Sequence, residues 1–522
     1  MILNRVLRRA VRYFPNNTAT IFDGHRQTYR ELGRRVQALS AALSARGIRR
    51  NDRIAIYLLN SSHFLETVYA CFEIGAVIVP LNTRLAADEL VFIINDAECK
   101  AFITDNLLQP LAAAFKNRLE GIEHFIAAGG GEAFTDYESL LTDHTDDLLP
   151  TTGDNSSDEE LAGLFYTSGT TGLPKGVMLS HRNLWMNALH TLATRAPEPN
   201  LNFLHAAPMF HLATFPAVIN ITTNGGTHTI LQKFDLKAML ELIESAQVTS
   251  TVLVPTMINF LINHPDFHNH DLSSLRRITY GAAPMPVELL KRTMKLLPNV
   301  EFNQGYGQTE SSPLLTSLHH EDHIPEGEER LTRRLASCGR PVVGVEVEIL
   351  KDDGNFAQPG EIGEVVARGP NVMMGYWKRP EETASTLRDG WLHTGDMAMT
   401  DEDGYIYLVD RKKDMIISGG ENVYSTEVEN VVYQHPAVRE AAIIGVPDEK
   451  WGEAVTAIVT LKPDTDLTDR ELMEFCAVRL ADYKVPKRVE IRAGELPKSG
   501  TGKIMKKELR EAYWQGHNRR VN

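Results

Sequence analysis

Short apolar runs alternate with helical patterns of apolar residues over the first 330 positions of the chain. The run IAIYLL after Arg53 is typical of a buried strand, and residues 63–75 space their large apolar side chains along one face of a helix. The next run, AVIVP, ends at Pro80. Other strand-like runs begin at residues 101, 124, 161, 248, 278 and 300. This alternation predicts an α/β fold of parallel sheets with helices packed on them.

The pattern changes after about residue 330. The segments VEVEIL and EVVARG are separated by polar and glycine-containing turns, which predicts a smaller antiparallel β part in residues 330–410. The charged run DRKKD, residues 410–414, has no apolar periodicity and marks a domain boundary. Beyond it, two helices are predicted to start with capping boxes, Thr426 with Glu429 and Thr468 with Glu471. We expect an N-terminal domain in residues 1–410, a linker in residues 411–414 and a small α+β domain in residues 415–522.

One uncharged stretch, from Pro199 to Gln232, raises the question of a membrane span. It contains two further prolines, a Gly-Gly pair and three histidines, so it lacks the run of about 20 apolar residues that a spanning helix needs. We expect a buried strand–helix–strand passage there instead.

Charge and cysteine usage narrow the functional classes. The 522 residues include 54 Lys and Arg against 68 Asp and Glu, a net charge of −14, which gives no electrostatic footprint for nucleic acid. The four cysteines form no CxxC pair, as suits a reducing compartment. Residues 1–13 carry four arginines but no apolar signal-peptide core, so a surface helix is expected there. These features favour a cytoplasmic protein.

Three glycine-containing loops follow predicted strands. They are TSGTTGLPKG from Thr167, GAAP from Gly281 and QGYGQTE from Gln304. Because the carboxyl ends of parallel strands meet at one edge of a sheet, these loops are expected to converge on one crevice. Backbone N–H groups, hydroxyls and a lysine in the first loop suit phosphate oxygens, although it is not a Walker A motif. A simple tight turn is the alternative interpretation of that loop.

Eight ordered motifs resemble those of the AMP-forming adenylating enzymes, which include acyl- and aryl-CoA ligases, adenylation domains of peptide synthetases and luciferases. The longest is YTSGTTGLPKGVMLSH from Tyr166. The others are MFH at 209, YGAAP at 280, NQGYGQTE at 303, WLHTGD at 391, YIYLVDRKKD at 405, ISGGENV at 417 and PKSGTGK at 497. The resemblance covers nearly the whole chain. It implies a large N-terminal domain that includes a β-barrel-like part, and a small mobile C-terminal domain.

The resemblance implies a two-step reaction that uses ATP, Mg²⁺ and coenzyme A. A carboxylate attacks the α-phosphate of ATP to give an acyl adenylate, and a thiol then displaces AMP. The first step brings two anions together, so positioned cations are needed. The small-molecule acid and CoA are the expected partners, with no nucleic acid and no integral membrane segment. Peripheral membrane contact and a homodimer are left open by the sequence.

Site residues are implied by position within the matching motifs. The ATP phosphates would be held by Thr167, Ser168, Gly169, Thr170, Thr171, Gly172 and Lys175. Adenine, ribose and the α-phosphate would be held by Gly281, Ala282, Ala283, Gln304, Gly305, Tyr306, Gly307, Thr309, Asp396 and Arg411. Glu310 would bind Mg²⁺ with Thr167 as a partner, a ligand set that suits a hard cation.

The resemblance implies separate roles for two lysines in the catalytic cycle. Lys503 would bridge the attacking carboxylate and the α-phosphate, and Lys413 would be the hinge about which the C-terminal domain rotates after adenylation. Rotation would bring Gly419 and Gly420 to the site and open a path for the CoA thiol. A solvated lysine is the alternative interpretation of Lys503.

The acid itself is less well specified. His211 would lie beside its carboxylate, and the Phe210-His211 pair lacks the acidic residue that amino-acid-activating relatives use, which favours a simple carboxylic acid. With Phe210, Leu212 and Phe215 as acyl-pocket residues, we expect a medium- or long-chain fatty acid. An aryl acid of the cinnamate or benzoate type is the alternative. A carrier-loading adenylation enzyme, a luciferase-like oxygenase and a non-catalytic lipid-binding relative are further alternatives.

Overall fold

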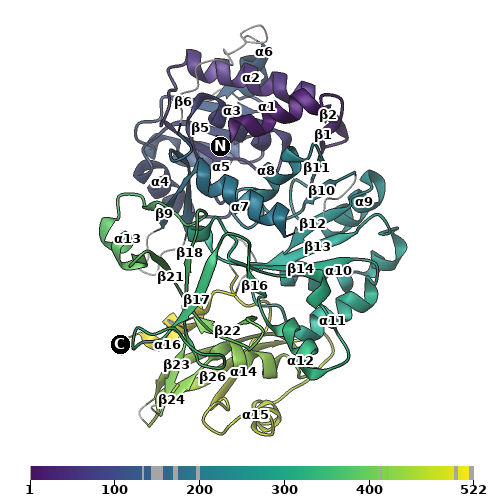
Figure 1. Cartoon of the computed structure of the whole chain (residues 1–522), viewed down its shortest axis with the longest axis vertical. Helices are drawn as coiled ribbons and strands as arrows, with labels where there is room; N and C mark the ends of the chain where they lie inside the picture. The colour runs from purple at the N-terminus through teal and green to yellow at the C-terminus, as the bar shows by residue number, and fades with distance from the viewer. Residues whose placement is uncertain are drawn as a thin grey trace.

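Two large sheets form the core of the N-terminal domain in the computed structural model (Figure 1). The structure describes residues 2–131, 134–142, 157–167, 174–194, 200–411, 414–419, 421–448, 450–498 and 504–515. Among these residues, no helix is long and apolar enough to cross a membrane.

The first large sheet has eight strands in the order β19-β9-β8-β4-β3-β5-β6-β7. Pairing is parallel from β8 to β7, while β9 and β19 join antiparallel. Its strands are β3 (Arg53–Tyr57), β4 (Val77–Pro80), β5 (Cys99–Asp105), β6 (His124–Ala128), β7 (Thr135–Asp136), β8 (Leu161–Thr167), β9 (Lys175–Ser180) and β19 (Gly375–Tyr376). The strand-like runs of the first 170 residues are therefore confirmed as parallel strands.

The second large sheet has nine strands in the order β16-β15-β14-β13-β12-β10-β11-β1-β2. Its six central strands, from β14 to β1, are parallel, and both edges are antiparallel. Its strands are β1 (Thr18–Phe22), β2 (His25–Thr28), β10 (Asn202–His205), β11 (Thr227–Ile230), β12 (Ser250–Leu253), β13 (Arg277–Gly281), β14 (Glu301–Tyr306), β15 (Thr316–Leu318) and β16 (Arg340–Pro341).

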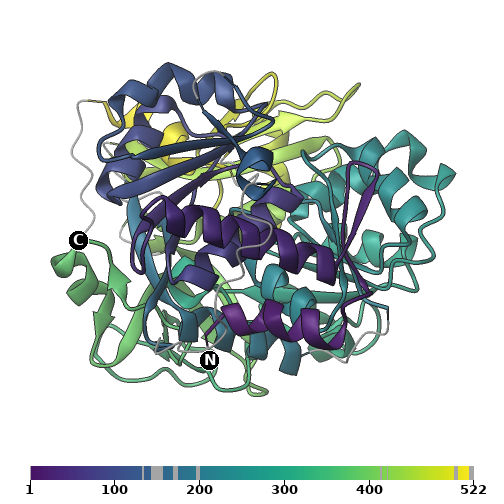
Figure 2. The ribbon, with the colours of Figure 1, turned by 90° about the horizontal axis from the view of Figure 1, so that it is seen from above.

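Amphipathic helices cover these sheets. They are α1 (Asn4–Tyr13), α2 (Tyr29–Ala45), α3 (Ser62–Ile74), α4 (Ala87–Asp96), α5 (Gln109–Phe115), α6 (Tyr137–Thr142), α7 (His181–Ala193), α8 (Phe215–Thr223), α9 (Leu236–Ala246), α10 (Pro255–Ile262) and α11 (Val287–Leu296). Helix α1 packs against α2, α3 and α8, and the ribbon of α1 runs along the outside of the domain in Figure 2. It buries Val6 and Leu7, so the predicted N-terminal surface helix is half buried. The uncharged stretch forms β10, α8 and β11, as predicted.

A smaller antiparallel sheet follows, as predicted for residues 330–410. Its strands are β17 (Glu346–Leu350), β18 (Gly363–Arg368), β20 (Leu387–Arg388), β21 (Trp391–Thr400) and β22 (Ile406–Arg411). The short helices α12 (Glu329–Thr332) and α13 (Pro380–Thr386) lie beside it in the chain. Strand β22 leads directly to the predicted linker, of which residues 412 and 413 are outside the described residues.

The C-terminal domain is a small α+β unit below the others in Figure 1. Its strands are β23 (Ile416–Ser418), β24 (Glu421–Val423), β25 (Val438–Asp448), β26 (Gly452–Leu461) and β27 (Arg488–Ile491). Its helices are α14 (Ser425–Val432), α15 (Asp469–Ala477) and α16 (Lys506–Trp514).

The two predicted capping boxes have different outcomes. At α15, Thr468 and Glu471 cap each other's backbone, as predicted. At α14 the prediction was wrong, because the helix starts at Ser425 and Thr426 lies inside its first turn. The Glu429 side chain turns inward instead, where it accepts the N–H of Ile443 and pairs with Lys506 at 2.7 Å.

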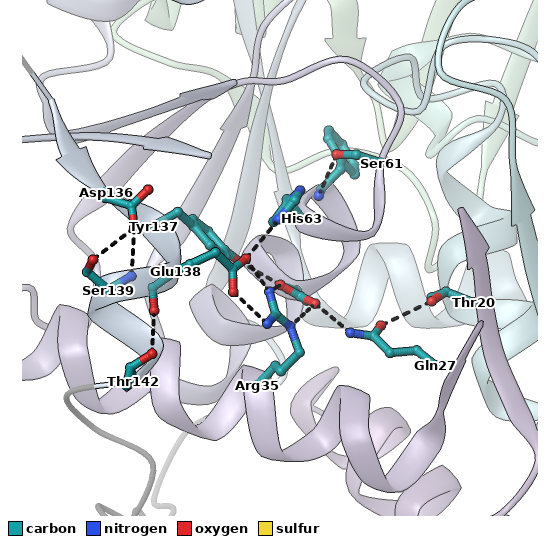
Figure 3. Close-up of polar contacts among 12 residues, drawn as sticks. Thr20, Gln27, Arg35, Ser61, His63, Asp136, Tyr137, Glu138, Ser139 and Thr142 are labelled. Carbon is teal, nitrogen blue, oxygen red and sulfur yellow. Dashed lines mark hydrogen bonds and ion pairs between the residues drawn. The ribbon is translucent and has the colours of Figure 1, made fainter. Parts of the chain in front are cut away.

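A buried polar cluster joins α2, α3 and α6 (Figure 3). Glu66 is fully buried, and it accepts hydrogen bonds from Gln27, Arg35 and Tyr137 at 2.6–3.1 Å. Arg35 also pairs with Glu138 at 2.7 Å. A buried carboxylate is tolerated only when it is paired and hydrogen-bonded, so this cluster fixes the relative positions of the three helices.

Asn60, which follows β3, connects the two large sheets by hydrogen bonds. Its side-chain N–H groups donate to the carbonyls of His205, Ala207 and Leu231 at 3.0–3.3 Å, and its Oδ1 accepts the N–H of Met209 at 2.7 Å. These partners belong to the ends of β10 and β11 and to the turn that precedes α8. One buried side chain therefore sets the position of that turn.

We expect Asn60→Ala to lower the free energy of unfolding by about 2–4 kcal/mol, because one N–H and several carbonyls lose their partner while buried. Chemical denaturation measures the change. Asn299→Ala, an exposed asparagine, is the control and should stay within about 0.5 kcal/mol of the parent. Equal effects of the two substitutions would show that Asn60 does not hold this junction.

Candidate active site

A cavity of about 1620 Å³ lies where the two large sheets meet the antiparallel sheet and the C-terminal domain. Its lining includes residues from β8, β9, β12, β13, β14, β21 and β22, and from the chain before α16. The strands β13 and β14 end there, so the carboxyl edge of a parallel sheet contributes one wall, as is usual for ligand sites in α/β folds.

Glycines allow the strand ends to approach one another. Gly281 and Gly305 are paired in β13 and β14, and a Cβ atom on Gly281 would lie 2.3 Å from the Gly305 carbonyl oxygen. A Cβ on Gly307 would lie 1.8 Å from the Pro313 carbonyl oxygen. No other residue type fits these positions without moving the backbone, and the result is a wall of exposed backbone groups.

Most residues expected around the nucleotide line this cavity together. They are Thr167, Lys175, Gly281, Ala282, Gln304, Gly305, Tyr306, Gly307, Thr309, Glu310, Asp396 and Arg411. Ala283 lies next to this set but does not contribute to the lining. Ser168, Gly169, Thr170, Thr171 and Gly172 are outside the described residues.

The carboxylate of Asp396 is held on both oxygens. Tyr306 donates its hydroxyl to Oδ2 at 2.8 Å, and Arg411 approaches Oδ1 at 3.3 Å from the paired position on β22. Burial raises the pKa of Tyr306 well above its usual value, so the phenol stays protonated and remains a donor. Asp396 is thus held in place as an acceptor that suits ligand hydroxyls.

Glu310 presents a buried carboxylate to the cavity. Tyr376 donates its hydroxyl to Oε1 at 2.8 Å, and the pKa of Glu310 is raised, chiefly by burial. The Nζ atom of Lys175 lies 5.4 Å from the centre of the Tyr376 ring. Lys175 of β9 is paired with Thr167 of β8 in the sheet. Because burial disfavours the charged form of this carboxyl group, a bound cation would stabilise it, so Glu310 with the Thr167 hydroxyl fits a hard divalent cation.

His211 lies at the start of the apolar part of the cavity. Its Nδ1 accepts the N–H of Ala213 at 3.1 Å, and burial lowers its pKa to about 4. The neutral ring must therefore carry its proton on Nε2, which makes Nε2–H a hydrogen-bond donor. Phe210 and Leu212 line the cavity on either side, as expected.

Phe215 is a correction to the expected acyl pocket. It does not line the cavity, because it starts α8 on the opposite face and packs edge-on against Phe165 at 5.2 Å in the core. The cavity face of α8 is formed instead by Pro216, Ala217, Asn220, Ile221 and Asn224. The sequence spacing of an aromatic near His211 did not reveal which face of the helix it would occupy.

The C-terminal domain reaches the cavity through the described residues that flank the PKSGTGK motif. Lys498 and Ile504 form an antiparallel bridge, and Lys498 and Met505 line the cavity. Lys498 also lies 5.8 Å from the centre of the Phe260 ring on α10. Lys503 itself is outside the described residues, but both neighbouring segments border the cavity.

Two of the remaining expected residues are also outside the described residues, namely Lys413 and Gly420. Gly419 lies in the turn between β23 and β24, with a φ of +63° and its N–H bonded to the carbonyl of Trp451 at 2.8 Å. It does not line the cavity in this arrangement of the domains.

The polar lining residues that sequence reasoning missed include Tyr376, Lys498 and Asn220. Lys498 lies within a recognised motif, but Tyr376 comes from β19, far along the chain from Glu310. Asn220 was hidden in an apolar helix. Only the packing of distant segments reveals their roles.

Comparisons with known proteins agree with this geometry. The model of the AMP-binding enzyme family matches residues 7–377, and that of the AMP-binding enzyme C-terminal domain matches residues 427–503. A feruloyl-CoA synthase from an Amycolatopsis species is 41% identical over 97% of this chain and 98% of its own. The long-chain-fatty-acid–CoA ligase FadD13 of Mycobacterium tuberculosis is 37% identical over 94% and 93%.

Solved structures of similar proteins cover the same length. The anthranilate CoA ligase AuaEII in complex with anthranoyl-AMP has a TM-score of 0.89 at 27% identity and covers 98% of this chain and 97% of its own. The o-succinylbenzoate CoA synthetase MenE of Bacillus subtilis, in complex with ATP and magnesium, has a TM-score of 0.83 at 29% identity, with 97% and 98% covered. This chain therefore belongs to the AMP-binding enzyme family and is an AMP-forming acid–CoA ligase.

Proposed function

We propose that this cavity carries both steps of the ligation, adenylation of a carboxylic acid and transfer of the acyl group to CoA. One observation carries the proposal: most of the residues expected at the nucleotide line one continuous cavity together with His211, Phe210 and Leu212, which were expected at the acid. The MenE structure named above holds ATP and magnesium within a similar fold. The cytoplasm, where ATP and CoA are available, is the proposed compartment.

In the first step, a carboxylate oxygen of the acid attacks the α-phosphorus of ATP. The new P–O bond forms as the bond to the β-phosphate oxygen breaks, and pyrophosphate leaves. Asp396 and Arg411 would hold the ribose, and the Nε2–H of His211 would orient the attacking carboxylate. Mg²⁺ held by Glu310 and Thr167 would neutralise charge on the phosphates. Lys503 would meet the negative charge that develops between the two reactants.

In the second step, the thiolate of CoA attacks the carbonyl carbon of the adenylate. The C–O bond to AMP breaks, AMP leaves with the electron pair, and a thioester remains. We propose that the C-terminal domain rotates about Lys413 between the steps, replacing Lys503 with Gly419 and Gly420. Residues on both sides of Lys413 are anchored differently: Arg411 pairs with Asp396, whereas Asp414 is held by Arg510 at 2.6 Å.

For the acid, two classes remain as candidates. The apolar cluster of Phe203, Ala217 and Ile221 beside the cavity suits the fatty acid expected from the sequence, and FadD13 supports that class. The feruloyl-CoA synthase, at 41% identity, and the fold of AuaEII support an aryl acid. We favour the aryl acid, because polar side chains occupy the far part of the cavity, as described below. Carrier-protein loading is a further alternative, since a fatty acid–[acyl-carrier-protein] ligase of Streptomyces coeruleorubidus is 34% identical.

Release of AMP that depends on both CoA and ATP, measured across acids from acetate through palmitate to cinnamate, tests the overall proposal. Release of pyrophosphate from the acid and ATP measures the first step by itself. Lys503→Ala should reduce this release about 10²–10³-fold, because a cation that stabilises the transition state is lost. The same variant should still convert supplied acyl adenylate and CoA into thioester.

Lys507→Ala, an exposed lysine on α16, is the matched control and should keep both half-reactions. If Lys503→Ala impaired both half-reactions equally, the two-conformation scheme would be wrong. If no acid released AMP from the parent protein, the ligase assignment of this cavity would fail.

We expect His211→Leu to reduce kcat/KM for the acid about 10–100-fold while the KM for ATP changes less than about twofold, because only the donor to the carboxylate is removed. Steady-state kinetics with each substrate varied in turn measure the two effects. His268→Leu replaces an exposed histidine and should change neither. A rise confined to the KM for ATP would place His211 at the nucleotide instead.

A further inference from the structure

The far part of the cavity runs along one face of the nine-stranded sheet. Residues on this face alternate along each strand, so Ser250 and Val252 of β12 and Arg277 and Thr279 of β13 all line the cavity. Phe203 of β10 is paired with Ser250, which is paired with Arg277. These strands therefore present layers of side chains that run from the carboxyl edge near Gly281 to the amino edge.

Helix α8 faces these strands. Its cavity residues Ala217, Ile221 and Asn224 recur at helical spacing, and the first two pack with Phe203 and Val252 in one apolar cluster. The space between helix and sheet is thus narrow and apolar on its sides. Two polar side chains interrupt this face, Asn220 and, at the end of the helix, Asn224.

Asn220 is 6% exposed, and its Oδ1 atom is buried without a hydrogen-bond partner. Its neighbour Asn224 does not satisfy it, because the Asn224 amide donates to the backbone carbonyl of Asn220 at 2.8 Å. Native polar side chains that are buried are nearly always hydrogen-bonded, so the amide of Asn220 lacks partners that such groups normally have. Because its Oδ1 has almost no accessible surface, a ligand in the cavity would meet this amide at Nδ2. An amide can both accept from and donate to a hydroxyl.

The position of Asn220 sets the size of that ligand. The carbonyl of His211 accepts the N–H of Phe215, so α8 begins directly after the turn that carries His211. Asn220 is five residues further, about 7.5 Å along the helix axis. This spacing suits an acid with one ring between its carboxylate and its polar group.

The layer beyond Asn220 is also polar. Arg277 lines the cavity at the amino edge of the sheet, where it pairs with Glu301 at 2.6 Å, and Ser250 lies beside it. A long alkyl chain that passed Asn220 would desolvate these groups without giving them a partner. The acid is therefore expected to end in a polar group rather than in further methylenes.

We propose that Asn220 is a specificity-determining residue that hydrogen-bonds a hydroxyl group at the far end of the acid, and that the substrate class is hydroxyaryl carboxylic acids. This inference rests on the proposed function of the same cavity. A ring without the hydroxyl leaves the amide buried and unpaired, and sites built to bind a hydroxyl discriminate strongly against its absence.

The test compares kcat/KM for 4-hydroxycinnamate and cinnamate in the CoA-dependent AMP-release assay. The parent enzyme should prefer 4-hydroxycinnamate at least about tenfold. In Asn220→Leu, the kcat/KM values for the two acids should lie within about twofold of each other, mainly because the value for 4-hydroxycinnamate falls. Activity of this variant on cinnamate shows that it is folded. Thr223→Val, on the same helix but outside the cavity lining, should keep the parent preference.

The outcomes separate this inference from the proposed function. If the parent enzyme used both acids equally, or used palmitate better than either, the ligase would stand and the role of Asn220 would be refuted. An unchanged preference in Asn220→Leu would refute it equally. If Asn220→Leu lost activity on both acids, the Asn220→Ser variant is measured instead. A preference for 4-hydroxycinnamate that is weaker than that of the parent enzyme, but still present, supports the proposal. A preference as large as that of the parent enzyme overturns it. No AMP release with any acid would refute the proposed function itself.

Discussion

The close approach of backbone at the carboxyl ends of β13 and β14 is the constraint on which the site depends. Gly281 and Gly305 are neighbours there, and a methyl group on Gly281 would collide with the Gly305 carbonyl. Because these positions have no side chains, backbone groups and the flanking Tyr306 and Ala282 face the cavity directly. The junction of the two large sheets then brings the end of β8 to the same cavity as the ends of β13 and β14, which lie more than a hundred residues further along the chain.

The electrostatics of the cavity differ from those of the chain as a whole. The protein carries a net charge of −14, yet Lys175, Arg411 and Lys498 all border the cavity, as suits anionic substrates. The carboxylates there have distinct environments. Asp396 is held by Tyr306 and Arg411, whereas Glu310 is buried beside a phenol and has a raised pKa. Asp396 is therefore held as an acceptor for ligand hydroxyls, and Glu310 is suited to a cation.

The C-terminal domain contributes to the same cavity while keeping its own core. Strand pairing and the buried ion pair of Lys506 with Glu429 hold it together, and Asp410 at the end of the N-terminal domain accepts the N–H of Ser425 at the start of α14. Contacts across the junction are mostly polar, which is the kind of interface that permits relative domain motion. Such an arrangement is compatible with one cavity serving two reactions.

Much of this protein was determined by local sequence. The alternation of apolar runs and helical patterns predicted the parallel sheets, since periodicity reflects which faces are buried. The glycine-containing motifs after β13 and β14 predicted residues that do line the cavity, because a close approach of the backbone there requires residues without side chains. Local sequence also predicted the cap at Thr468 but misplaced that at Thr426, where the contact of Glu429 with Lys506 outweighs a local cap.

The tertiary structure alone decided which face of α8 lines the cavity. Phe215 and Asn220 belong to the same apolar helix, and nothing in their spacing showed that the aromatic ring would enter the core while the amide would face the cavity. That choice follows from the angle at which α8 packs on the sheet, which in turn depends on Asn60 and the turn that it holds. Packing between segments distant in sequence sets that angle, so it cannot be derived from local pattern.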